Sequence, residues 1–175
     1  AGTESAMRAQ AASSGLEIPV KITAGGAERQ DSVRIALELV SAEAEIVVVQ
    51  DAARPFTTPA MFVACIDAAA RSGGAITAIP LADTLKRAID ETIVATIPRA
   101  GLWQAQTPQA FRRALLMDAH ARAARKRIPA TDDADLVEQL GATVQIVPGS
   151  QLNLKITTPD DLVIAAAIAR ELDPR

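Results

Sequence analysis

Short runs of β-branched residues alternate with stretches of helical periodicity along the chain. Ile46–Val49 shows no polar alternation, which is typical of a strand buried on both faces. Ala75–Pro80 and Val144–Pro148 are two further predicted strands. Ser32–Val40 has apolar residues at i, i+3, i+4 and i+7, which predicts an amphipathic helix capped by Asp31. Strands that alternate with helices favour an α/β domain with a mostly parallel sheet.

The pattern changes between residues 83 and 107. Thr84–Ala88 and Ile93–Pro98 are predicted strands on either side of a turn at Asp90 and Glu91, which indicates an antiparallel arm. No repeat, low-complexity tract or linker divides the sequence. We therefore expect residues 1–175 to form a single domain with a protruding β-arm inserted at 83–107.

Composition and charge narrow the classes of function. The net charge of −3 comes with no basic stripe, and only 2% of the residues are aromatic, which argues against nucleic-acid binding. The longest apolar run, Leu162–Ala169, is too short to span a bilayer, and Ala1–Gln10 does not have the pattern of a signal peptide. Cys65 is the only cysteine, which suits a reducing compartment. We expect a cytoplasmic protein with no nucleic-acid or membrane partner.

The segment directly after the strand at Ile46–Val49 is the first candidate for chemistry. Ligands bind in open α/β sheets beyond the carboxyl ends of the strands. Asp51 could hold a divalent cation or a substrate hydroxyl there, and Arg54 could bind a phosphate. The alternative is structural, with Asp51 capping the turn and pairing with Arg54.

Three further segments carry suitable groups but are ambiguous on their own. The segment Gly25–Ser32 lies between a predicted strand and a helix start, where paired glycines and free N–H groups suit a ligand, although a plain turn is favoured. Gly101–Gln109 is rich in hydrogen-bonding side chains and is interpreted as a structural loop. Lys155 lies in an apolar, strand-like segment, where it would either bind a phosphate or extend to the surface.

The remaining reactive side chains do not point to metal or thiol chemistry. His120 is the only histidine, and no second histidine or cysteine lies near it in the sequence. A zinc site or a Cys–His pair therefore has no support. We expect His120 to be a solvated residue of an alanine-rich helix and Cys65 to belong to the core.

Taken together, six segments resemble the 2-C-methyl-D-erythritol 4-phosphate cytidylyltransferase family. They occur in the family's order and cover nearly everything from residue 25 onwards: GGAERQDSV (25–33), VVVQDAARPF (47–56), DTLKRA (83–88), RAGLWQAQTPQAF (99–111), TDDADLVE (131–138) and NLKITTPDDL (153–162). The resemblance implies a Rossmann-like nucleotidyltransferase fold, Mg²⁺ dependence and a homodimer formed by the arm. The substrates it implies are CTP and a sugar-alcohol phosphate.

The resemblance also assigns roles to individual residues. Asp51 would bind the metal and take part in catalysis, together with Arg99 and Lys155. Arg99 and Thr107 would reach the partner subunit's site, whereas Lys155 would hold the acceptor phosphate in its own chain. The other substrate-binding positions are Arg54, Thr84, Thr107 and Thr131, and the nucleotide-binding positions are Gly25, Gly26, Ser32 and Ala52.

One family feature has no counterpart in this sequence. Relatives open with a strand and a glycine-rich loop whose Arg and Lys clamp the triphosphate, and none of the nine glycines here has that context. We therefore expect residues 1–175 to be N-terminally incomplete and, alone, not to turn over CTP, since each lost phosphoryl-stabilising donor costs roughly 10²–10³ in rate. Turnover near that of a complete relative would contradict this. Two alternative functions are a ribitol-5-phosphate cytidylyltransferase and a non-catalytic domain that only binds nucleotide or dimerises.

Overall fold

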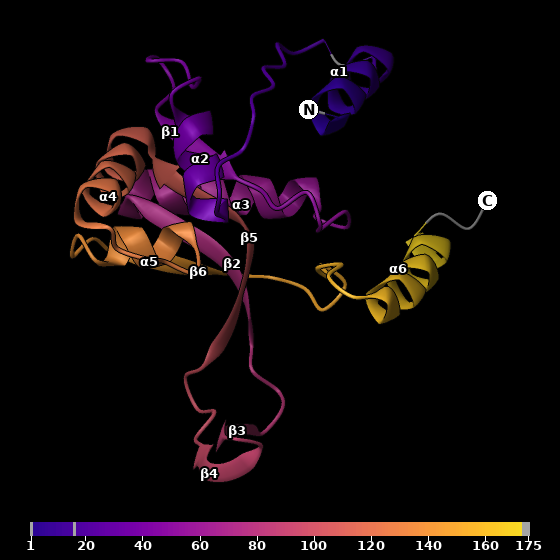
Figure 1. Cartoon of the computed structure of the whole chain (residues 1–175), viewed down its shortest axis with the longest axis vertical. Coiled ribbons are helices and arrows are strands. Elements are labelled where there is room, and N and C mark those ends of the chain that lie inside the picture. Colours follow the sequence, from indigo (N-terminus) through magenta and orange to yellow (C-terminus); the bar gives the residue numbers. More distant parts are fainter. Residues whose placement is uncertain (1, 16, 173–175) are drawn as a thin grey trace.

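A computed structural model describes residues 2–15 and 17–172 (Figure 1). Twelve helices and strands follow one another within these ranges. They are α1 (Gly2–Ser13), α2 (Arg29–Leu37), β1 (Ile46–Val49), α3 (Pro59–Ser72), β2 (Gly74–Pro80), β3 (Leu85–Ile89), β4 (Thr92–Ile97), β5 (Trp103–Arg112), α4 (Arg113–Lys126), α5 (Asp133–Glu138), β6 (Val144–Pro148) and α6 (Pro159–Leu172). The three predicted central strands are confirmed as β1, β2 and β6.

Four strands form the central sheet in the order β1-β5-β2-β6. β5 is antiparallel to both of its neighbours, whereas β2 and β6 are parallel. β1, β2 and β6 therefore all run in one direction, which confirms the expected α/β fold with a mostly parallel sheet. The long strand β5 was not predicted, because Gly101–Gln109 was interpreted as a loop.

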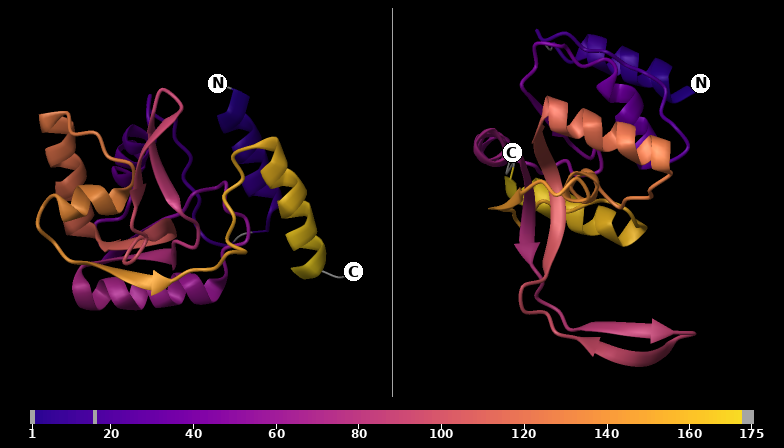
Figure 2. Two further views of the ribbon diagram at one scale, coloured as in Figure 1. Left: turned by 90° about the horizontal axis from the view of Figure 1, so that it is seen from below. Right: turned by 90° about the vertical axis from the view of Figure 1, so that its left-hand side faces the viewer.

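Helices cover both faces of this sheet, as Figure 2 shows. On β5 the neighbouring residues Ala110 and Phe111 are both fully buried, and they point to opposite faces because side chains alternate along a strand. Ala110 packs in a cluster with Cys65 of α3, which confirms the predicted burial of that cysteine. Phe111 packs on the other face with residues of α2, α4 and α5, among them Leu116. The sheet thus lies between two helical layers.

The arm is a separate two-stranded sheet made of β3 and β4. The strands are antiparallel, as predicted, and they project away from the central sheet (Figure 1). Their turn at Asp90 and Glu91 has positive φ angles of 46° and 62°, the conformation of the tight turns that match strand twist in two-residue hairpins. Every residue of β3 is exposed. Whether the arm pairs with a second subunit stays a prediction.

Two local predictions ahead of the sheet were wrong. α2 begins at Arg29, with Glu28 at its N-cap and Asp31 already inside the first turn, so Asp31 does not cap the helix. Ser32 explains the earlier start, because its Oγ accepts the Gly26 N–H at 3.0 Å and donates to the Glu28 carbonyl at 3.1 Å. The strand expected before Gly25 is not formed, since residues 17–28 pair with no neighbouring strand.

α6 contains the longest apolar run of the sequence but has only 14 residues. Within residues 2–15 and 17–172, none of the helices combines the length and the apolar character needed to cross a membrane. Figure 1 shows α6 away from the central sheet, and three neighbouring residues on it, Leu162, Val163 and Ile164, are exposed.

Asp161 fixes the start of α6 through three hydrogen bonds to one carboxylate oxygen. The donors are the N–H groups of Thr157 and Thr158, both at 2.8 Å, and the Thr157 hydroxyl at 2.9 Å. These bonds lower the pKa of Asp161 from 3.8 to about 2. A carboxylate whose pKa is depressed in the folded state stabilises that state above its ordinary pKa and loses the effect as the pH falls through the depressed value.

We therefore predict that the start of α6 loosens in acid. The amide-proton NMR signals of Thr157 and Thr158 should titrate together with a midpoint near pH 2, the pKa of about 2 expected for Asp161. Asp161→Asn should abolish that titration because the amide carries no charge. A midpoint near the ordinary aspartate value would show that the three bonds do not hold the carboxylate in solution.

Candidate active site

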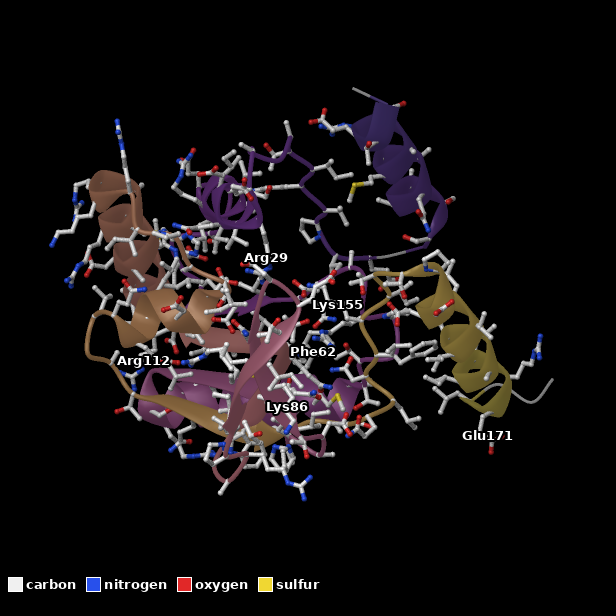
Figure 3. The ribbon with its side chains drawn as sticks, turned by 60° about the horizontal axis from the view of Figure 1, so that its bottom comes forward. Arg29, Phe62, Lys86, Arg112, Lys155 and Glu171 are labelled. Carbon is white, nitrogen blue, oxygen red and sulfur yellow. The ribbon has the colours of Figure 1, made fainter. Side chains whose placement is uncertain are left out.

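Asp51 lies just beyond the carboxyl end of β1 and is held between two cations. Its Oδ1 pairs with Arg29 Nε at 3.1 Å and its Oδ2 with Lys155 Nζ at 2.9 Å. Figure 3 shows Arg29 and Lys155 approaching from different elements, the first turn of α2 and the loop after β6. Burial favours protonation of Asp51, but the Lys155 hydrogen bond and the Arg29 charge outweigh it, so the pKa lies below its ordinary value. Asp51 is therefore an ionised group at neutral pH.

The loop that carries Lys155 is tied directly to the loop of Asp51. The Ile156 N–H donates to the Ala53 carbonyl at 2.8 Å. Residues 151–157 form no strand, contrary to the strand-like interpretation of this segment. A short backbone contact, rather than strand pairing, thus brings Lys155 to the carboxylate.

Arg29 has a second, deeper partner. Its Nη1 binds Asp133 Oδ2 at 2.8 Å, and the Asp133 side chain is only 1% exposed. Burial disfavours the Arg29 charge, but the carboxylates of Asp133 and Asp51 more than compensate, so the pKa of the guanidinium is raised. Asp133 in turn binds His120 Nε2 at 2.9 Å. The expectation that His120 is solvated was wrong: the residue is 2% exposed, because it lies on the face of α4 that packs against the core.

Arg54 is a half-buried cation held only by backbone oxygens. Its Nη1 donates to the Asn153 carbonyl at 2.7 Å, and its Nη2 donates to the Ala105 carbonyl at 3.4 Å. Its Nε is buried with no hydrogen-bond partner, and within the described residues no carboxylate oxygen lies within 4.0 Å of it. Burial lowers the pKa of Arg54, and the charge of Asp51 opposes this only in part. A half-buried positive charge that is bound only by neutral backbone oxygens favours the binding of an anion.

These groups line one small polar cavity of about 200 Å³. It brings together five of the predicted site residues: Asp51, Arg54, Thr107, Thr131 and Lys155. Arg29, Ala105, Gln106, Gln109 and Asp132 complete the lining. We call this the polar cavity.

A second, larger cavity of about 540 Å³ lies between α2 and β1. The predicted nucleotide-binding residues Ser32 and Ala52 line it, and Arg29 and Asp51 line both cavities. Close by, Gly26 donates its N–H to Ser32, and a Cβ at Gly26 would overlap the Cβ of Asp31, so only glycine fits there. Gly25 precedes it in the same exposed loop. The pair Arg29–Asp51 is thus the boundary between the two cavities.

Four predicted residues line neither cavity: Gly25 and Gly26 in the loop before α2, and Thr84 and Arg99. Thr84 and Arg99 are exposed at the base of the arm, where Arg99 Nη1 donates to the Ala82 carbonyl. Thr107, which was expected to reach a partner subunit, is instead 3% exposed and accepts the Asp51 N–H of its own chain at 3.1 Å. β5 runs through the middle of the sheet, so Thr107 cannot extend outwards as Arg99 can.

Comparison with known proteins identifies the fold and the family. The family model described as 2-C-methyl-D-erythritol 4-phosphate cytidylyltransferase matches residues 3–171. The chain belongs to this family. The cytidylyltransferase of this name from Syntrophus aciditrophicus is 50% identical over 155 residues, which cover 88% of this chain and 66% of the relative. The one from Deinococcus radiodurans is 47% identical over 156 residues, which cover 89% and 66%.

A solved structure supports the same assignment. The crystal structure of 2-C-methyl-D-erythritol 4-phosphate cytidylyltransferase from Thermus thermophilus is 43% identical and superposes with a TM-score of 0.82 over 90% of this chain and 79% of that chain. The expected nucleotidyltransferase fold is thereby confirmed. The chain spans slightly less than two thirds of the length of the curated cytidylyltransferases that it matches, at 66% for the two relatives above.

Buried polar side chains of β5 are the part of this candidate site that sequence reasoning missed. Gln109 is 1% exposed and donates to Asp132 Oδ2 at 2.9 Å. Gln106 Oε1 accepts from Asn153 Nδ2 at 3.1 Å, and Asn153 is fully buried. These bonds join β5 to the loops that carry Thr131 and Lys155. The available signal was the cluster of amide side chains between Gln104 and Gln109, which is too polar for a core strand without a site beside it.

The donor groups around Asp51 suit a cation that is held mainly by substrate. Within residues 2–15 and 17–172, no cluster of three or more His, Cys, Asp or Glu side chains could hold a metal ion. Asp51 offers one carboxylate, and both of its oxygens already bind cationic side chains. Mg²⁺ is commonly held by one or two carboxylates together with substrate phosphates. The described residues therefore fit a phosphate-borne Mg²⁺ and do not form a protein cage for it.

Proposed function

We propose that this chain forms the acceptor-binding part of an enzyme that transfers the cytidylyl group of CTP to 2-C-methyl-D-erythritol 4-phosphate and releases pyrophosphate. The observation that carries this proposal is the half-buried Arg54 guanidinium, which faces the polar cavity without a carboxylate partner. The relatives' names give the acceptor as 2-C-methyl-D-erythritol 4-phosphate. Arg54 would bind the phosphate group of this acceptor.

In this reaction a phosphate oxygen of the acceptor attacks the α-phosphorus of CTP. A new P–O bond forms, and the bond from the α-phosphorus to the bridging oxygen breaks, so that pyrophosphate leaves with that electron pair. Arg54 and Lys155 would hold the attacking phosphate, and Asp51 would hold Lys155 in place. Catalysis then depends on positioning and charge neutralisation, which dominate phosphoryl-type transfer.

The nucleotide would approach from the second cavity. Gly25, Gly26, Ser32 and Ala52 would contact the cytidine, and Arg29 and Asp51 would separate it from the acceptor. Mg²⁺ would be held by Asp51 directly or through water, together with the nucleotide's phosphates, and would neutralise charge on the transferred group. Thr131 lines the polar cavity and would complete the acceptor site, whereas Thr84, predicted to bind the same phosphate, lies outside this cavity at the base of the arm.

The subunit arrangement and the location belong to the same proposal. The exposed arm would pair two chains into a homodimer and carry Arg99 into the partner's site. The protein would act in the cytoplasm, in the non-mevalonate route to isoprenoids.

Calorimetry of this chain with 2-C-methyl-D-erythritol 4-phosphate tests the proposal directly. We expect binding that is lost in Arg54→Ala and is weaker for ribitol 5-phosphate. A preference for ribitol 5-phosphate would favour that acceptor, and CTP·Mg²⁺ binding without any acceptor binding would favour a nucleotide-binding domain.

We expect turnover to depend on the phosphate loop that the family resemblance predicts ahead of the matching segments. We therefore define the loop-bearing fusion, in which the residues of the Syntrophus aciditrophicus relative that precede its aligned segment are joined ahead of this chain. Pyrophosphate release by this fusion, in the presence of CTP, Mg²⁺ and acceptor, tests the reaction itself.

A further inference from the structure

A chain of charged and polar groups runs from the buried His120 to the polar cavity. His120 on α4 binds Asp133 at 2.9 Å, Asp133 binds Arg29 at 2.8 Å, and Arg29 binds Asp51 at 3.1 Å. Lys155 completes the chain at 2.9 Å from Asp51. His120 and Asp133 do not line the polar cavity, so neither is placed to touch a substrate there.

We propose that Asp133 and His120 are positioning residues for the acceptor site, because they set how Arg29 and Lys155 share Asp51. This proposal rests on the proposed function only for the identity of the acceptor. Neither Asp133 nor His120 was predicted from the sequence to be a site residue.

The sharing of Asp51 depends on where the Arg29 guanidinium is held. Arg29 uses Nε for Asp51 Oδ1 and Nη1 for Asp133 Oδ2, which leaves Asp51 Oδ2 to Lys155. A guanidinium prefers a two-bond fork on a single carboxylate. If the charge of Asp133 is removed, Arg29 gains from turning both nitrogens to Asp51, and its side chain, 34% exposed, has room to do so. Lys155 then loses the oxygen that holds it at the cavity.

His120 acts on Arg29 through its contact with Asp133. Asp133 Oδ1 accepts from His120 Nε2, and the pair is buried, with side-chain exposures of 1% and 2%. His120 Nδ1 is buried without a hydrogen-bond partner, so the ring proton belongs on Nε2, where it can donate to the carboxylate. Without this donor, Asp133 would keep a buried, unsatisfied oxygen, which would favour rotation of the carboxylate away from Arg29.

NMR of this chain tests the positioning role without any assumption about activity. The ¹⁵N–¹H signal of the Arg29 Nε–H group is assigned by its loss in Arg29→Lys. We expect a resolved signal in the wild type that broadens or moves in Asp133→Asn and His120→Leu. It should be retained in His120→Gln, whose amide can still donate to Asp133. Leu116→Val, a buried change on the same helix outside this chain of contacts, is the control for general loosening of the core.

Calorimetry with 2-C-methyl-D-erythritol 4-phosphate tests the consequence for the site. We expect about tenfold weaker binding in Asp133→Asn and His120→Leu, the lower end of the loss caused by removing outer-shell partners of ligating groups. Affinity should be near wild type in His120→Gln and Leu116→Val. If one of the two disruptive variants does not fold, the other, compared with His120→Gln, carries the test.

The possible failures have different meanings. An unchanged Arg29 signal in a folded Asp133→Asn variant overturns the proposal, and so does a changed signal with unchanged acceptor affinity. A wild-type chain that binds no acceptor contradicts the proposed function instead, while the Arg29 signal still decides whether Asp133 and His120 hold that side chain.

Discussion

Mixed dimers of Asp51→Ala and Arg99→Ala, made in the loop-bearing fusion, are expected to regain activity that neither variant has alone. Asp51 lies in the polar cavity, whereas Arg99 is exposed at the base of the arm and lines no described cavity of its own chain. If the arm carries Arg99 to the partner's site, each active site of a twofold dimer combines Asp51 of one chain with Arg99 of the other. Each single variant should therefore be nearly inactive.

Co-refolding the two variants in equal amounts gives a quantitative expectation. With random pairing about half of the dimers are mixed, and each mixed dimer has one intact site, so about a quarter of the wild-type rate should return. Arg71→Ala, which removes an exposed arginine from the last turn of α3, away from the arm, is the control and should stay active. Native mass spectrometry verifies the mixed dimers. Activity that stays flat at every mixing ratio would show that Arg99 serves its own chain.

Removing Lys155 should greatly weaken binding of the acceptor and leave binding of CTP nearly unchanged. Lys155 and Arg54 both line the polar cavity, whereas the predicted nucleotide-binding residues Ser32 and Ala52 line the other. Loss of a charge-assisted contact costs about 1.5–3 kcal/mol. In the loop-bearing fusion, Lys155→Ala should therefore weaken acceptor binding about 10- to 100-fold, with CTP affinity nearly unchanged. Steady-state kinetics with each substrate varied in turn gives the two values.

Lys86→Ala is the matched control for this change. Lys86 lies on the arm, is exposed and contacts Thr96 Oγ1 at 2.7 Å, so its removal takes away the same charge outside the cavity. Figure 3 labels both lysines. If Lys155→Ala weakened CTP binding and spared the acceptor, Lys155 would belong to the nucleotide site.

Much of the fold was predictable because its signals are local. The run Ile46–Val49 is apolar enough to indicate a buried strand, and the turn at Asp90 and Glu91 separates two β-rich segments of the arm. β5 was missed for the opposite reason. Its centre consists of Gln106, Thr107 and neighbouring polar residues, and their burial makes sense only with the site beside them.

The candidate site shows the same division between local and distant information. Asp51 and Arg54 follow a strand, in the position where α/β sheets bind ligands, so a sequence pattern could indicate them. Arg29 and Asp133 are separated by 104 positions in the chain, and no local pattern predicts that they meet. His120 was misjudged because an alanine-rich helix does not reveal from sequence which face is buried.

At the polar centre of β5, the residues that would best stabilise the strand differ from those that the candidate site needs. Gln106 and Gln109 occupy interior sites of the central sheet where, by packing alone, valine or isoleucine would fit a strand better. A redesign guided only by folding stability would replace them and disconnect the loops of Asp132 and Asn153. Thermostable variants of this protein should therefore be sought in its helices and surface, with β5 held fixed.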